Sequence, residues 1–217
     1  MKRSIFFLLF ISCLYCTFAS AESSYTIFDD KMLLDGYATK YQEEPKEILL
    51  AIIQDDTLTS YKTAAAVRVF KENFSSNVFA KERHLIEKIL LRRLNRTESP
   101  FVQIEIMHTL LKMDRYKYFK SMIPDLIQEL DHYNKTVNDL SYTAIDDIIK
   151  SGHNRPREAR LVFNTLRKIL FLSRKRLQNI KEPNEKLQHK LDILRWAVKI
   201  LGTQELKRLP PEVINLF

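Results

Sequence analysis

The apolar pattern of residues 99–131 returns at the C-terminal end of the chain, in residues 186–217. With an offset of 87 residues and no gap, the two stretches agree in apolar phase over two helical segments and the turn between them. The matched pairs include Ile106 and Ile193, Met107 and Leu194, Leu110 and Ala197, Met122 and Leu209, Pro124 and Pro211, and Ile127 and Ile214. Agreement across two helices and a turn is more than shared amphipathicity, and it indicates a structural repeat.

Two further stretches fit the same pattern with other offsets. An offset of 38 residues brings residues 140–150 into phase with residues 102–112, and an offset of 41 does the same for residues 65–71. The sequence therefore predicts four helical hairpins, at about 60–97, 99–135, 137–182 and 186–217. Neither helix of such a hairpin can bury its apolar stripe alone, so neighbouring hairpins are expected to stack.

Glycine is scarce, with only 3 residues in the chain. A glycine-rich phosphate loop or dinucleotide fingerprint cannot be formed from Gly36, Gly152 and Gly202, which lie far apart. The sequence also has no alternating apolar runs bounded by Asn-Gly or Asp-Gly turns, the usual sign of β-hairpins. Leu, Ile, Lys, Arg and Glu at helical spacing fill the chain instead, so the predicted fold class is all-α.

The second hairpin carries a family resemblance. Its segments "VQIEIMHTLLKMD" and "MIPDLIQELD" resemble a short HEAT-like repeat, in which an apolar first helix closes at a Leu-Gly-Asp-like turn and the second helix opens with proline. Leu-Gly at 201–202 and Leu-Pro at 209–210 resemble this pattern more closely, whereas Gln103 and Ile106 depart from it. The resemblance covers roughly residues 60–217 and implies a right-handed superhelical stack of antiparallel helix pairs, a HEAT-like α-solenoid of about four repeats. It also implies a scaffold that presents helix surfaces to a partner, most often a protein.

Residues 1–21 have the pattern of a secretory signal peptide, because two basic residues precede an apolar run that ends in Ala-Ser-Ala. The run is too short to span a bilayer, which needs about 20 apolar residues. Both cysteines, Cys13 and Cys16, lie within it, so the mature chain is predicted to hold no disulfide and no cysteine-based zinc site. The predicted location is the periplasm, with secretion as the alternative; a retained or lipidated signal is the minority reading.

Residues 22–58 differ from the repeats and are predicted to form an N-terminal helical cap, with helices near 25–42 and 45–56. A solenoid needs terminal units with a polar outer face. We expect the acidic side chains of this segment to supply it: Asp29, Asp30, Glu43, Glu44, Asp55 and Asp56.

Charge divides the chain into two parts. Residues 22–149 hold 17 Lys and Arg against 21 Asp and Glu, whereas residues 150–217 hold 16 against 6, a net charge of +10. Such asymmetry creates a field that attracts an acidic partner. The basic surface is predicted on the outer faces of one helix, at Arg167, Lys168, Arg174, Lys175 and Arg176.

An anion-binding site is predicted at the start of the same helix. Pro156 belongs in the first helical turn, and the basic residues on either side of it oppose the helix dipole. A bound anion would relieve this opposition, because a helix N-terminus offers free N–H groups. The predicted site consists of His153, Arg155, Arg157 and Arg160. The alternative is a solvated turn with Glu158 as its counterion.

The sequence predicts no catalytic residue, no metal site, no cofactor and hence no enzyme. The five histidines lie far apart, none has a metal-binding spacing, and no Gly-x-Ser-x-Gly motif occurs. The predicted function is a non-catalytic exported helical-repeat scaffold that mediates protein–protein interaction in the cell envelope. The alternative is a peripheral binder of anionic envelope polymer or lipid headgroups through the basic C-terminal third. Nucleic acid is not an expected partner of an exported chain.

Overall fold

The computed structural model describes residues 30–114, 116–151 and 155–217. In these ranges the regular structure is helical and no strand occurs, so the all-α prediction is confirmed. Residues 1–21, Asp29 and His153 lie outside the described residues, and nothing in the structure bears on the signal peptide predicted there. Every helix in the described ranges is too short or too polar to cross a membrane.

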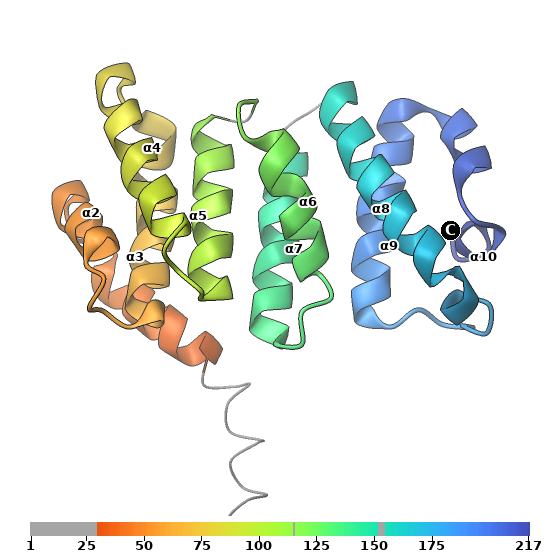
Figure 1. Ribbon diagram of the computed structural model, residues 1–217, viewed down its shortest axis with the longest axis horizontal. Coiled ribbons are helices and arrows are strands. Elements are labelled where there is room, and N and C mark those ends of the chain that lie inside the picture. Colours follow the sequence, from red (N-terminus) through yellow and green to blue (C-terminus); the bar gives the residue numbers. More distant parts are fainter. Residues whose placement is uncertain (1–29, 115, 152–154) are drawn as a thin grey trace, which may run out of the picture.

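The helices follow one another along the long axis of the molecule in chain order (Figure 1). A first helix covers residues 30–41. It is followed by α2 (Lys46–Gln54), α3 (Ser60–Asn73), η1 (Ser75–Asn77), α4 (Ala80–Leu94), α5 (Pro100–Met113), α6 (Phe119–Glu129), α7 (Lys135–Lys150), α8 (Pro156–Leu177), α9 (Glu185–Leu201), η2 (Thr203–Arg208) and α10 (Pro211–Ile214).

Local sequence signals explain several helix ends. The side chain of Asn134 accepts a hydrogen bond from the Thr136 N–H at 2.9 Å and so caps the start of α7. Asn184 caps α9 in the same way, through the Leu187 N–H at 2.9 Å. At the other end of α9, Gly202 has a φ of +97°, a conformation that residues with a side chain rarely adopt.

Two features of the expected hairpins are different in the structure. Pro124 lies inside α6 and not at its start, because Phe119, Met122 and Ile123 are buried and extend the helix toward its N-terminus. In the last hairpin the partner of α9 is a 3₁₀ turn, η2, followed by the single short turn of α10. Asp30 also differs from expectation, since it is buried at 7 % exposure and does not face solvent.

Helix α5 lies at the centre of the packing. It contacts α3 on one side and α7 on the other, and 11 of its residues are buried. A second set of contacts joins α2 to α4 and α6 to α8, while α8 packs on α9. Fully buried side chains such as Ile106 and Leu110 each stabilise the fold by about 1.5–3 kcal/mol. The stacked helices α3, α5 and α7 therefore form the rigid floor on which polar side chains can be positioned.

Candidate functional site

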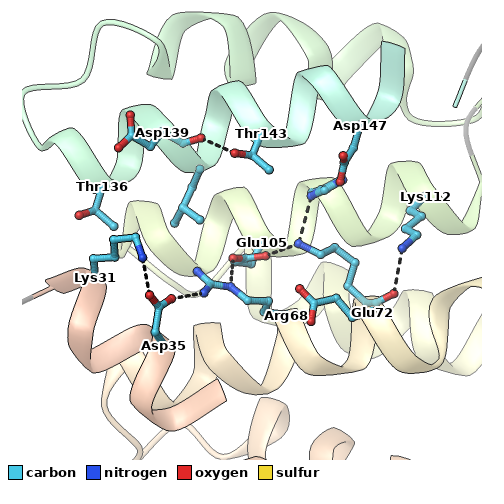
Figure 2. A pocket seen from close by; sticks show the side chains of 13 residues that line it. Lys31, Asp35, Arg68, Glu72, Glu105, Lys112, Thr136, Asp139, Thr143 and Asp147 are labelled. Atoms are coloured by element: carbon cyan, nitrogen blue, oxygen red, sulfur yellow. Dashed lines mark hydrogen bonds and ion pairs between the residues drawn. The ribbon is translucent and has the colours of Figure 1, made fainter. Parts of the chain in front are cut away.

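A cavity of about 330 Å³ lies where α3, α5, α7 and the helix over residues 30–41 meet (Figure 2). A second cavity of about 410 Å³ adjoins it and shares His108, Lys112 and Asp147. We call the two together the central groove. Its lining is mostly polar: Lys31, Asp35, Arg68, Lys71, Glu72, Glu105, His108, Leu111, Lys112, Thr136, Asp139, Leu140, Thr143, Asp147, Ile148, Lys150 and Ser151.

One edge of the groove is built around the carboxylate of Glu105, which is 2 % exposed. Its Oε1 accepts from Arg68 Nε at 2.8 Å and its Oε2 accepts from Lys71 Nζ at 2.7 Å. Burial alone would raise the pKa of Glu105, but the charges and hydrogen bonds of Lys71 and Arg68 outweigh it and hold the pKa below its ordinary value. Glu105 is therefore an ionised counterion for two cations of α3.

The same arginine ties the first helix of the structure to this cluster. Arg68 Nη1 donates to Asp35 Oδ1 at 2.8 Å, and Lys31 Nζ lies 2.5 Å from Asp35 Oδ2. Burial raises the pKa of Asp35, yet the hydrogen bonds and charges of Lys31 and Arg68 lower it further than burial raises it. Asp30 closes the end of the groove, since its carboxylate accepts from Tyr61 Oη of α3 and from Asn134 Nδ2 at 2.6 Å.

His108 stands at the junction of the two cavities and is 3 % exposed. Its Nδ1 lies 3.1 Å from Lys71 Nζ, and because an ammonium group can only donate, this ring nitrogen must accept. Burial and then the Lys71 charge lower the pKa of His108 to about 3, so the ring is neutral with its proton on Nε2. The 3.5 Å approach of Nε2 to Asp147 Oδ2 is then a contact between a dipole and a carboxylate, and not an ion pair.

The opposite wall of the groove belongs to α7. Asp139, Thr143 and Asp147 follow one another at intervals of four residues and thus share one helix face. Thr143 Oγ1 donates to the backbone oxygen of Asp139 at 2.8 Å. Burial raises the pKa of the Asp139 carboxyl, and within the described residues no hydrogen bond or ion pair reaches that group. The groove thus places unengaged acceptors on α7 opposite donors on α3 and α5.

This arrangement is suited to binding. Lys71 is held by Glu105 and His108, and Arg68 by Glu105 and Asp35, so their charges are largely compensated in place. Among the residues the structure describes, no group of three His, Cys, Asp or Glu side chains is placed to hold a metal ion. What the groove offers is a preformed set of hydrogen-bond donors and acceptors in a concave site.

The residues of the predicted anion site turn to different partners. The guanidinium of Arg155 lies 4.8 Å from the centre of the Tyr116 ring, and its buried Nη1 has no hydrogen-bond partner among the described residues. Arg160 bonds to Glu205 of η2, which also lies 3.1 Å from Arg208. Arg157 is exposed. Arg160 therefore already has a carboxylate partner, and the anion site remains a prediction.

The predicted basic surface lies on α8. Lys168, Arg174, Lys175 and Arg176 are exposed and Arg167 is half-buried. Two apolar side chains are exposed between them, Phe171 at 50 % and Leu172 at 77 %. Charged and apolar groups thus share the outer face of this helix.

Sequence reasoning missed the central groove, although one signal for it existed. Glu105 is the only charged residue in the apolar run "FVQIEIMHTLL", and a lone carboxylate in such a run must find a cation when it is buried. Its partners come from α3, 34 and 37 residues earlier in the chain. Comparisons of the chain with protein-family models, with curated proteins and with solved structures find no match, so no relative assigns a ligand to this groove.

Proposed function

We propose that this chain is a non-catalytic helical-repeat scaffold that binds a partner protein through the central groove. The proposed architecture is a right-handed superhelical, HEAT-like stack of about four repeats, at about 60–97, 99–135, 137–182 and 186–217, with residues 22–58 as an N-terminal cap. The signal-peptide pattern of residues 1–21 favours an exported scaffold that works in the cell envelope, most simply in the periplasm.

The observation that carries the proposal is the origin of the groove lining. Its side chains come from α3, α5 and α7, the first helices of three successive proposed hairpins. Contacts between these helices join residues at similar separations, 37 for Arg68 with Glu105 and 39 for His108 with Asp147. Parallel helices in equivalent positions produce such a pattern, and repeat proteins use the extended surface that results for binding.

The dimensions of the groove suit an extended polypeptide segment. Its lining on α7 runs from Thr136 to Ser151, a rise of about 22 Å at 1.5 Å per helical residue. An extended chain covers this length with about six residues. A segment with both basic and acidic side chains would pair with Asp139 and Asp147 on one wall and with Lys112 on the other. The basic C-terminal third adds long-range attraction for a partner with an acidic surface.

The experiment is capture of envelope proteins with the mature chain, residues 22–217, washed at low and at high salt. Thr143→Trp fills the groove from the exposed middle of the α7 wall, and Asn164→Trp adds the same bulk to an exposed position of α8. We expect one discrete protein to be retained at high salt by the wild type and by Asn164→Trp, and to be lost with Thr143→Trp.

Titration calorimetry with the purified partner then gives the affinity, which we expect to fall at least tenfold in Thr143→Trp. Recovery of only lipid or acidic polymer, removed by the salt wash, would overturn the proposal. Equal loss in both tryptophan variants would also overturn the assignment of the groove.

A further inference from the structure

We propose that the outer face of α8 is a second binding surface, which docks the protein on an anionic lipid bilayer. This inference is independent of the proposed scaffold function, because the central groove and the outer face of α8 share no residue. The surface consists of Lys168, Phe171, Leu172, Arg174, Lys175 and Arg176, and we call it the α8 face.

The helical register places these side chains together. Lys168, Phe171, Leu172 and Lys175 occupy positions i, i+3, i+4 and i+7, which form one continuous stripe along a helix. The buried side chains of α8, among them Val162, Phe163, Leu166 and Leu170, lie on the other side and pack toward α6 and α9. The α8 face is therefore preformed, and binding would not require the helix to fold.

The charges of the α8 face are uncompensated. Among the described residues, none of its four cations takes part in a salt bridge, whereas Arg160, Lys190 and Arg195 of the same region each have a carboxylate partner. Arg174 lies over the Phe171 ring, 4.8 Å from its centre, and this contact leaves the charge of the guanidinium unchanged. A complementary anionic surface would meet all four cations at once.

The apolar pair selects a bilayer over a soluble anionic polymer. Leu172 is 77 % exposed and Phe171 is 50 % exposed, with Lys168 and Lys175 one turn away on either side. A polymer would engage only the cations. An interfacial helix, by contrast, buries large apolar side chains below the headgroups while its basic residues contact the lipid phosphates. The α8 face has both parts of this arrangement.

The test is sedimentation of the mature chain, residues 22–217, with vesicles of phosphatidylcholine alone or with about one third phosphatidylglycerol. We expect binding to the anionic vesicles only, and a steep loss of binding between 0.1 and 0.5 M salt on the order of the screening expected for surface charges. Each cation near an anionic membrane contributes on the order of fivefold in affinity, so Lys168→Glu with Lys175→Glu should weaken binding at least about 25-fold.

A matched pair on another helix controls for net charge. Lys81→Glu with Lys88→Glu changes two exposed lysines of α4 that are also seven residues apart and have no salt bridge among the described residues. We expect this pair to weaken binding less than threefold. An equal loss in both pairs would mean that the net positive charge alone attracts the protein to the vesicles, and would overturn the α8 face as a specific surface.

Replacement of the apolar pair separates lipid from polymer. Phe171→Ser with Leu172→Ser keeps every charge and should weaken vesicle binding at least about tenfold, because two buried apolar side chains are lost. Met32→Ser with Leu33→Ser, also an adjacent exposed pair, should have no effect. In addition, the fluorescence of a Leu172→Trp variant should shift to the blue on anionic vesicles. Unchanged binding by the serine pair together with an unshifted fluorescence would overturn the bilayer proposal and leave a purely charged ligand.

Discussion

At the scale of single residues, Glu105 carries the heaviest electrostatic demand in the protein. Its carboxylate is buried and is the shared counterion of Arg68 and Lys71. Glu105→Gln keeps the size of the side chain but removes the charge, so two poorly solvated cations lose their partner. Loss of one member of a buried ion pair costs about 3–5 kcal/mol, and we expect the free energy of unfolding to fall by about 3 kcal/mol in urea denaturation at pH 7.

Glu47→Gln is the matched control for this substitution, because the Glu47 side chain is exposed and lies only at the edge of an ion pair, 3.9 Å from Lys46. It should change the free energy of unfolding by less than about 0.5 kcal/mol. A similar small effect for Glu105→Gln would contradict the role of Glu105 as a buried counterion.

His108 makes the stability depend on pH in a defined direction. Its folded pKa of about 3 lies below the ordinary value of 6.5, so the unfolded chain binds the proton more readily. The neutral ring therefore stabilises the fold fully above pH 6.5, and this contribution is lost progressively as the pH falls toward 3. Between pH 7.5 and pH 5 the loss should be about 2 kcal/mol. The measurement is urea denaturation at both pH values.

The His108→Gln variant should lack this part of the pH dependence, even though it is less stable at both pH values. His84→Gln, in an exposed position of α4, should keep it. If His108→Gln and the wild type lost the same free energy between pH 7.5 and pH 5, the ring of His108 would have to be protonated in the folded protein.

At the scale of elements, apolar periodicity located the helices, and two local signals fixed their ends less well. Helix α5 was predictable because proline begins it and an apolar run fills it. Pro124 was misleading: its missing N–H leaves unpaired only the carbonyl of the exposed Lys120, so the burial of Phe119 and Ile123 decides where α6 begins. The short α10 could not be foreseen, because matched apolar phase does not fix the length of a helix.

The caps of α7 and α9 provide a matched test at this scale. Both Asn134 and Asn184 accept a backbone hydrogen bond in the first turn, and loss of such a cap costs about 1 kcal/mol. Asn134 also donates to the buried Asp30 at 2.6 Å. We expect Asn184→Ala to lower the free energy of unfolding by about 1 kcal/mol and Asn134→Ala by about 2 kcal/mol, because the second variant leaves a buried acceptor with one partner fewer. Equal effects in denaturant titrations would show that the bond to Asp30 adds nothing.

At the scale of the whole molecule, the sequence predicts the elements of the central groove but not their meeting. The groove needs Asp35, Arg68, Glu105 and Asp147 side by side, and these residues are spread over 112 positions of the chain. Apolar phase places each helix face against the core, but it does not specify which polar residues of two neighbouring faces are opposite each other. The basic surface of α8 was easier to predict, because all its cations lie on one helix and need no partner from another.

The overall shape offers a test of the proposed stack that does not depend on any ligand. A compact globule of about 196 residues has a radius of gyration of about 16 Å. Helical pairs added along one axis, in the order seen in Figure 1, give a longer particle of the same mass. Small-angle X-ray scattering of residues 22–217 should therefore give a radius of gyration clearly above 16 Å and an asymmetric distance distribution with a long tail. A value near 16 Å with a symmetric distribution would mean that the helices close on themselves, and the stack with its extended groove would have to be abandoned.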